Sequence, residues 1–106
     1  MFKDDTTRLR HMLDAAHEAI GFAQGRARSD LDNDRMLVLA LVKDVEIIGE
    51  AAFQVSPETR EQLSGIPWED IIGMRHRLVH AYFAINLDSL WVTVRDDWPR
   101  RVEILQ

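Results

Sequence analysis

The segment GMRHRLVHAYFAI, residues 73–85, places several ionisable side chains in an otherwise apolar stretch. Arg75 and His80 are the two whose chemistry is complementary. A guanidinium group binds a phosphate through two hydrogen bonds, and an imidazole exchanges a proton near neutral pH. The pair therefore suits chemistry at a phosphate, in which Arg75 would hold the anion and His80 would act as general acid or base.

The spacing of these two residues has a geometric consequence if the segment is helical. Each residue turns an α-helix by about 100°, so Arg75 and His80, five positions apart, lie about 140° from each other around the axis. The two side chains then flank one edge of the helix. A second copy of that edge, related by a two-fold axis, would place two arginines and two histidines around a shared cleft. The spacing permits such a composite site without requiring it.

Two other interpretations of the same residues stay open. In a structural one, Arg77 is a solvated surface charge and His76 a polar residue that a helix tolerates, while His80 is a hydrogen-bonded core histidine and Tyr82 lies at the rim of the core. In a metal-binding one, His76 and His80 are ligands at positions i and i+4 of a helix, a spacing that zinc uses. That site would need a third ligand, for which His11, His17 or a carboxylate is available.

The composition limits the functions that the chain can have. It has 106 residues, a net charge of −5 and no cysteine, which indicates one globular domain, residues 1–106, without disulfides or thiolate metal sites. The acidic balance argues against a broad basic surface that coats nucleic acid, but it leaves room for a local basic notch. The polar N-terminus and the shortness of the apolar run 36–42 predict a cytoplasmic protein without a membrane span. The arginines are concentrated in pairs: Arg26 and Arg28, Arg75 and Arg77, Arg100 and Arg101.

Apolar residues recur at spacings of three and four along nearly the whole chain, which predicts an all-α fold. We expect an up-and-down bundle of four main helices plus a short helix. The β-branched run LWVTV would suit a strand, but an isolated strand would leave its backbone groups unpaired. The main helices are expected at about 5–24, 31–54, 67–84 and 89–106, with the short helix at 56–63.

Particular residues indicate where the helices begin, end or approach each other. Asp4 or Asp5 can cap the first helix, and Gly25 can end it. Gly49 lies in the most apolar helix, where glycine costs about 1 kcal/mol relative to alanine, so it indicates the close approach of another backbone. Pro99 should kink or restart the last helix just before that residue.

Several further residues with chemical potential favour structural roles. His11 and His17 have no evident partner in the sequence pattern. The three tryptophans could stack on bases, but in a small bundle they are typical of packing or interfaces. Glu46 and Glu50, four apart, could form a carboxylate pair, but ion pairs explain them as well, and Glu50 could pair with an arginine of residues 73–85.

Arg75, His80 and Tyr82 form the pattern R-x4-H-x-Y, and the polar His76 directly follows the arginine. With this motif the chain resembles the HepT-like ribonuclease toxins of the HEPN superfamily, in which a polar residue often follows the arginine. The resemblance covers most of the chain. It includes VEIIGEAA at 45–52, IPWEDIIGMRH at 66–76 and LWVTVRDDWPRRVEIL at 90–105.

The resemblance implies a homodimeric helical bundle in which the two motif helices face each other. It also implies an endoribonuclease that uses no metal or other cofactor. The 2′-hydroxyl of RNA attacks the adjacent phosphorus, which leaves a 2′,3′-cyclic phosphate and a 5′-hydroxyl. Carried over by position, Arg75 and His80 are the catalytic residues and His76 supports the pocket. DNA lacks the 2′-hydroxyl and should not be cleaved.

Tyr82 has a separate role in this resemblance. The family's antitoxin, a minimal nucleotidyltransferase, transfers AMP from ATP to the motif tyrosine. An AMP group two residues from His80 would occupy the RNA site and repel phosphate. The main alternative is a non-catalytic HEPN module that binds nucleotide or RNA beside the same partner, and a third is an oligomeric scaffold. The presence of both Arg75 and His80 favours the enzyme.

Overall fold

The computed structural model describes residues 3–81 and 86–105, and for residues 3 and 78–81 it describes the backbone alone. Every element in this part of the chain is helical, which confirms the predicted all-α class. In chain order the elements are α1 (Lys3–Ala23), α2 (Asp30–Asn33), α3 (Arg35–Gln54), α4 (Pro57–Gln62), α5 (Trp68–Ala81), α6 (Leu87–Val92), the π-helical turn η2 (Thr93–Asp97) and α7 (Trp98–Leu105).

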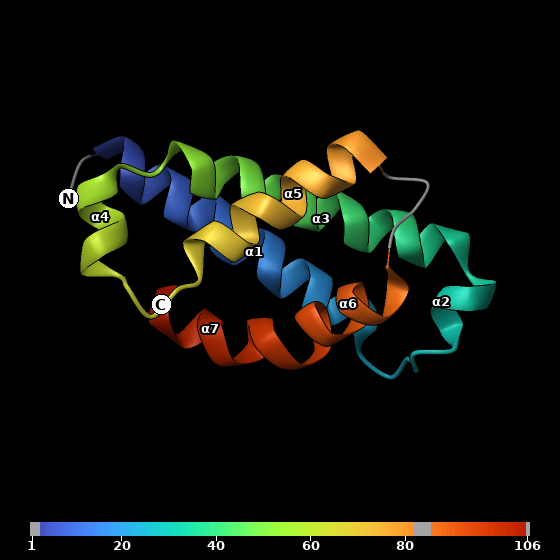
Figure 1. The fold of residues 1–106 in the computed structure, drawn as a ribbon. Helices are drawn as coiled ribbons and strands as arrows, with labels where there is room; N and C mark the ends of the chain where they lie inside the picture. Colours follow the sequence, from blue (N-terminus) through green and yellow to red (C-terminus); the bar gives the residue numbers. More distant parts are fainter. Residues whose placement is uncertain (1–2, 82–85, 106) are drawn as a thin grey trace.

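The two longest helices, α1 and α3, lie side by side at the centre of the bundle (Figure 1). Helix α5 packs against α3, while η2 and α7 pack against α1. The short helices α2 and α4 lie at opposite ends of the molecule (Figure 1). The four main helices are therefore α1, α3, α5 and the continuous run from α6 through α7, as the sequence pattern predicts.

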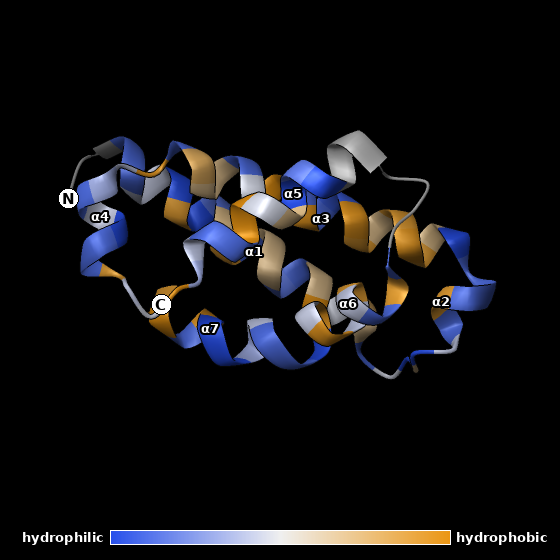
Figure 2. Cartoon of the chain, viewed as in Figure 1, coloured by the Kyte–Doolittle hydropathy of each residue, from blue (hydrophilic) through white to orange (hydrophobic). Residues whose placement is uncertain are grey.

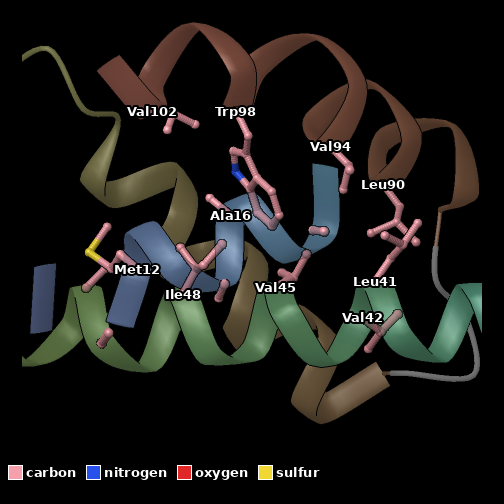
Figure 3. Packing of buried hydrophobic residues seen from close by; sticks show 14 of the residues in the cluster. Met12, Ala16, Leu41, Val42, Val45, Ile48, Leu90, Val94, Trp98 and Val102 are labelled. Carbon is pink, nitrogen blue, oxygen red and sulfur yellow. The ribbon is translucent and has the colours of Figure 1, made fainter. Parts of the chain in front are cut away.

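The hydrophobic core lies between α1, α3 and the C-terminal run of helix (Figure 3). Met12, Leu41 and Leu90 are each at most 1% exposed, and Trp98 is 6% exposed. Colouring by hydropathy shows that the outer edge of α7 is hydrophilic (Figure 2). Helix α3 contributes buried side chains on most of its turns, which confirms the prediction of a central, much-buried helix.

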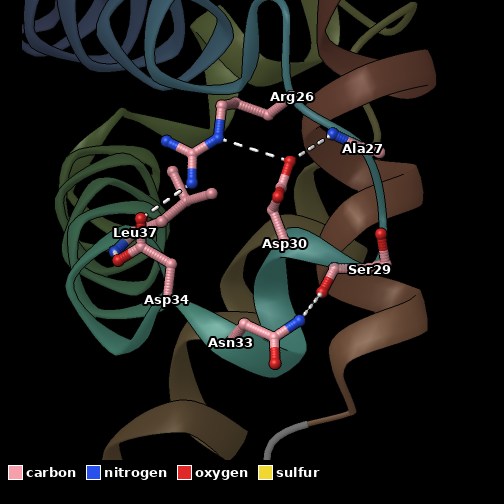
Figure 4. Close-up of polar contacts among 7 residues, drawn as sticks. All are labelled: Arg26, Ala27, Ser29, Asp30, Asn33, Asp34 and Leu37. Carbon is pink, nitrogen blue, oxygen red and sulfur yellow. Dashed lines mark hydrogen bonds and ion pairs between the residues drawn. The ribbon is translucent and has the colours of Figure 1, made fainter.

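The predicted helix over 31–54 is broken at Asp34, so that boundary was wrong. Asp34 has extended backbone angles (φ −125°, ψ 91°), and its side chain accepts a hydrogen bond from the backbone N–H of Leu37 at 3.1 Å (Figure 4). An aspartate that caps a helix in this way must leave the helical conformation itself. The residues before it form the separate turn α2.

Asp5 does not cap its own helix, so that prediction was also wrong. Helix α1 begins at Lys3, which places Asp5 inside the first turn. Its carboxylate instead accepts hydrogen bonds from the backbone N–H of Ser56 at 2.9 Å, from the Ser56 hydroxyl at 2.5 Å and from the Thr59 hydroxyl at 2.6 Å. These bonds, led by that of the Ser56 hydroxyl, lower the pKa of Asp5. Asp5 thereby anchors the start of α4 to the start of α1.

Other local signals are confirmed. Gly25 has a positive φ of 74° just after α1 ends, a conformation that favours glycine. The last helix restarts at Trp98 after the π-helical turn, immediately before Pro99. Proline has no N–H to donate to the carbonyl of Arg95, which accounts for an irregular turn at this point. No helix in the described ranges is long and apolar enough to cross a membrane.

One acidic side chain lies inside the bundle. Asp44 on α3 is 0% exposed, and neither of its carboxyl oxygens accepts a hydrogen bond within the described part of the chain. Burial, together with the neighbouring carboxyl of Glu18 on α1, raises the pKa of Asp44 to about 7. A proton held between the two acids would supply the donor that the buried oxygens need.

Candidate functional site

The three arginine pairs differ in what their guanidinium groups contact. Arg26 binds Asp30 and Asp34, with its Nη2 2.7 Å from the Asp34 carboxylate (Figure 4). Arg28 binds Asp32 at 3.1 Å and a further carboxylate on α6 at 2.6 Å. The acidic run that follows the first arginine pair therefore neutralises it, and this pair serves the α1–α3 connection.

The C-terminal arginine pair is also engaged by the fold. Arg100 contacts the carboxylate of Asp97 and the carbonyl of Asp96, both at 3.1 Å. Arg101 donates to the carbonyl of Gly65 at 3.2 Å. The third pair, Arg75 and Arg77, lies on α5.

Arg75 is brought to its place by the close packing of α5 on α3 at Gly49. A Cβ added at Gly49 would overlap the Cβ of Arg75, and it would lie 2.7 Å from its Cγ and 3.3 Å from the carbonyl oxygen of Ile71. Only glycine leaves room for the two helices at this separation. The predicted close approach at Gly49 is confirmed, and its partner is the motif helix itself.

Glu50, the next residue on α3, holds the Arg75 guanidinium. The Nη2 of Arg75 lies 2.8 Å from one carboxylate oxygen of Glu50, and the other oxygen accepts a hydrogen bond from Gln54 at 2.9 Å. The predicted pairing of Glu50 with a motif arginine is therefore confirmed. The Arg75 side chain is 34% exposed and that of Glu50 is 49% exposed, so the ion pair contributes about 0.2–1 kcal/mol and orients Arg75 without closing it off.

Arg75 and Glu50 line an open groove of about 370 Å³ between α1, α3 and α5. The α1 wall carries Arg8 and His11, which are three positions apart and share a face of the helix. The remaining lining residues come from α3: Lys43, Glu46, Ile47, Glu50, Ala51 and Gln54. Basic, acidic and imidazole groups from three helices thus converge on one concave surface.

The other motif residues are described by the structure only in part. His76 is exposed on α5, one position after Arg75. The backbone of His80 continues α5, but its side chain lies outside the described residues, as does the whole of Tyr82. The juxtaposition of Arg75 with His80 therefore stays a prediction. Among the side chains that are described, no three histidines, aspartates or glutamates are grouped as a metal site.

Sequence reasoning assigned His11 a structural role and did not consider Arg8. Both belong to the groove that Arg75 lines, on the helix opposite. The available signal was their three-residue spacing on α1, which places them on one face. That signal does not say which helix the face meets, so the sequence could not connect them with Arg75.

The tryptophans have the packing roles predicted for them. Trp68 is 8% exposed, and its indole N–H donates to the carbonyls of Arg60 and Leu63 at 3.2 and 3.0 Å. Trp98 lies in the core (Figure 3). Trp91 is partly buried, with the Arg95 guanidinium 5.9 Å from its ring centre.

Comparison with known proteins identifies the family of this chain. Residues 12–106 match the family described as Ribonuclease HepT-like. A "Putative RNase" of Methanocaldococcus jannaschii is 33% identical over 92 residues, which cover 87% of this chain and 84% of that protein. Another protein named "Putative RNase", from Caldanaerobacter subterraneus, is 37% identical over 86% of this chain and 81% of its own length.

A third relative carries the family name itself. The "Probable ribonuclease HepT" of Thermococcus cleftensis is 36% identical over 66 residues, which cover 62% of this chain and 60% of that protein. The chain matches no solved structure. The family match includes the central helix α3 and the motif helix α5, and with these relatives it shows that the chain belongs to the HepT-like ribonuclease family.

Proposed function

We propose that this protein is the RNA-cleaving toxin of a toxin–antitoxin pair, a metal-independent endoribonuclease whose catalytic residues are Arg75 and His80. Membership of a ribonuclease family supports RNA as the substrate. The observation that carries the proposal is the position of Arg75. Its side chain lines an open groove and is 34% exposed, and its guanidinium is oriented by a weak ion pair.

The weakness of that ion pair favours phosphate binding. An exposed pair contributes at most about 1 kcal/mol, whereas a hydrogen bond to a charged group contributes about 1.5–3 kcal/mol. A phosphate that accepts two hydrogen bonds from Arg75 can therefore compete with Glu50 for the guanidinium. Glu50 would keep the side chain extended toward the groove until RNA arrives.

The chemistry requires only groups that RNA and this chain provide. The 2′-oxygen forms a bond to phosphorus, and the bond from phosphorus to the 5′-oxygen of the next nucleotide breaks. A proton leaves the 2′-hydroxyl and a proton reaches the departing 5′-oxygen, which is the work proposed for His80. Arg75 stabilises the negative charge that grows on the phosphoryl oxygens, and His76 supports the pocket. The products are a 2′,3′-cyclic phosphate and a 5′-hydroxyl.

We propose that the active form is a homodimer whose motif helices face each other. Exposed apolar side chains on the outer face of α3 support self-association: Leu39 is 47% exposed and Phe53 is 63% exposed. They are fourteen residues apart, close to four helical turns, so they lie nearly on one line of the helix. Sedimentation velocity should show a dimer, and Phe53→Glu should shift it toward monomer.

Tyr82 is proposed as the site of control. A minimal nucleotidyltransferase antitoxin would transfer AMP from ATP to the tyrosine hydroxyl, forming a phosphodiester and releasing pyrophosphate. The added phosphate is negative and the nucleoside is bulky, and both would oppose RNA binding near His80. Intact-mass measurement of protein produced with its antitoxin should show one AMP adduct, and Tyr82→Phe should remove it.

The nuclease test uses unmodified protein, single-stranded RNA and an excess of EDTA. Wild-type protein should cleave and leave 2′,3′-cyclic phosphate ends, while Arg75→Ala and His80→Ala should each lose at least about a hundredfold in rate. Arg77→Ala is the matched control, because Arg77 is an exposed arginine on the same helix. It should retain activity to within a fewfold.

The outcomes separate the two main functions. Loss of cleavage in EDTA would contradict the metal-independent mechanism. No cleavage by unmodified wild-type protein, combined with retained binding of RNA or nucleotide, would instead assign the protein to the non-catalytic HEPN modules. Equal losses in Arg77→Ala and Arg75→Ala would show that general positive charge, and not a specific guanidinium, is responsible.

A further inference from the structure

The groove that Arg75 lines extends well beyond the proposed catalytic pair. We propose that its Arg8, His11 and Lys43 side bind backbone phosphates of the RNA strand next to the scissile phosphate. This inference rests on the proposed ribonuclease function, and it assigns a role to residues outside the R-x4-H-x-Y motif. Its basis is the set of charged side chains that α1, α3 and α5 place around the groove.

The groove has the charge balance that a phosphate strand needs. Its lining has three cations, Arg8, Lys43 and Arg75, against the two acids Glu46 and Glu50. The chain as a whole has a net charge of −5. Two other open grooves, of about 150 and 480 Å³, have more acidic than basic side chains. Within a negatively charged protein, this groove is therefore a place where a polyanion can approach.

The two acids of the groove, Glu46 and Glu50, differ in how firmly they are paired. Glu50 is held by Arg75 and Gln54, at 2.8 and 2.9 Å. Lys43 is 3.8 Å from Glu46, and its side chain is 70% exposed. Such a loose, solvated pair has little strength. The ammonium group of Lys43 can turn to a phosphate at small cost, because its stem is flexible.

The length of the groove suits more than one nucleotide. Its α3 wall runs from Lys43 to Gln54, and the eleven helical steps between them span about 16 Å at 1.5 Å per residue. A stacked nucleotide strand rises about 3.4 Å per nucleotide. Arg75 contacts this wall at Glu50, about one turn before Gln54, and Lys43 lies at the other end. The strand would therefore lie along α3, with Arg8 and His11 on its far side.

The basic and imidazole side chains of this groove can all donate hydrogen bonds to phosphate oxygens. Arginine and lysine offer only N–H donors, and an imidazole can donate to a phosphate oxygen in either protonation state. Contacts of this kind hold the backbone in register without reading sequence. We therefore expect the groove to bind RNA of different sequences with similar affinity and with a strong dependence on salt.

The experiment measures binding without cleavage. A fluorescent single-stranded RNA with 2′-O-methyl groups throughout has no free 2′-hydroxyl and cannot undergo the proposed reaction. Its affinity for unmodified protein is followed by anisotropy over a range of salt concentrations. The double variant Arg8→Gln/Lys43→Gln is compared with Arg10→Gln/Arg35→Gln, which removes the same charge at two exposed arginines outside the groove. Circular dichroism verifies that both variants remain helical.

The groove variant should bind at least about tenfold more weakly at low salt, and its slope of log affinity against log salt should fall by about 1.4, which is about 0.7 for each lost phosphate contact on a single strand. The control variant should stay within about twofold of wild type in affinity. His11→Ala should weaken binding less than the double variant, since it removes a single imidazole, which can donate a hydrogen bond even when it is neutral. On cleavable RNA, the groove variant should raise KM with little change in kcat.

Two results would overturn the inference. One is equal affinity of the wild-type protein and the groove variant, and the other is an equal loss in the Arg10→Gln/Arg35→Gln control. The inference and the proposed function fail separately. If wild-type protein cleaves RNA in EDTA but the groove variant binds normally, only the groove assignment is wrong. If the groove binds RNA and no RNA is cleaved, the ribonuclease proposal fails and a binding module remains.

Discussion

Asp44 is an acid inside the helix bundle, and replacing it by asparagine should stabilise the protein above neutral pH. Its side chain is 0% exposed, and burial with the nearby carboxyl of Glu18 raises its pKa to about 7. In the unfolded chain the same group ionises near 3.8. Between these two values the folded protein binds a proton that the unfolded chain has released. Stability should therefore fall as the pH rises through this interval.

The size of the effect follows from the interval. Each pH unit within it changes the free energy of unfolding by about 1.36 kcal/mol per proton. From pH 5 to about 7 the wild type should lose about 2–3 kcal/mol from Asp44 alone. Asp44→Asn has no such proton, and its amide can donate to Glu18. Relative to wild type, the variant should therefore be more stable at pH 8 than at pH 5 by about that amount.

The assay is urea unfolding followed by far-ultraviolet circular dichroism at pH 5, 6, 7 and 8. Protein concentration is held constant, because self-association would add to the measured stability. The quantity of interest is the difference between wild type and Asp44→Asn, since the titration of histidines is common to both. Asp14→Asn, at an exposed position of α1, is the charge control and should change stability by less than about 0.5 kcal/mol. A difference that does not vary with pH would refute the buried proton.

Two further predictions concern contacts between the helices. Gly49→Ala should lower the melting temperature, because overlap of the new methyl group with Arg75 costs about 1–3 kcal/mol. At Gly21 the space is open, so Gly21→Ala should raise the free energy of unfolding by up to about 1 kcal/mol. Equal stability of the two variants in thermal melts would contradict the close packing of α5 on α3. Asp5→Asn should lower the melting temperature at pH 7, since the carboxylate is held by hydrogen bonds from Ser56 that lower its pKa. The contribution of the carboxylate to stability is present above pH 3.8 and is lost as the pH falls, so the difference in melting temperature from wild type should shrink toward pH 2. A difference that stays constant with pH would argue against this role of the carboxylate.

Local signals in the sequence predicted most of the helices and several of their ends. Helix α4 begins at Pro57, within the short helix expected at 56–63, and the Ser56 hydroxyl caps it by accepting from the backbone N–H of Thr59. Asn86 caps α6 in the same manner. These features depend on residues within one turn of each other, so their effect can be evaluated without knowing the fold. Gly49 is a partial exception, since its presence implied a neighbour without identifying α5.

The errors arise where a local signal has a distant partner. Asp5 resembles an N-cap in the sequence, but it binds the start of α4, 51 and 54 positions away. Asp34 lies in the polar run 32–35, which the predicted helix included, and the break there is stabilised by an ion pair with Arg26 at 2.7 Å as well as by the cap that Asp34 itself makes. The choice between continuing and breaking the helix thus depended on an ion pair across a turn.

The sequence by itself determined the helical class, the family motif and the placement of Arg75 and His80 on one helix, because a period of 3.6 residues is a property of the local chain. The tertiary structure decided which guanidinium groups are neutralised, and it brought Arg8 and His11 to the groove beside Arg75. Helix packing selects neighbours dozens of positions apart by shape and burial. No short-range pattern records that choice.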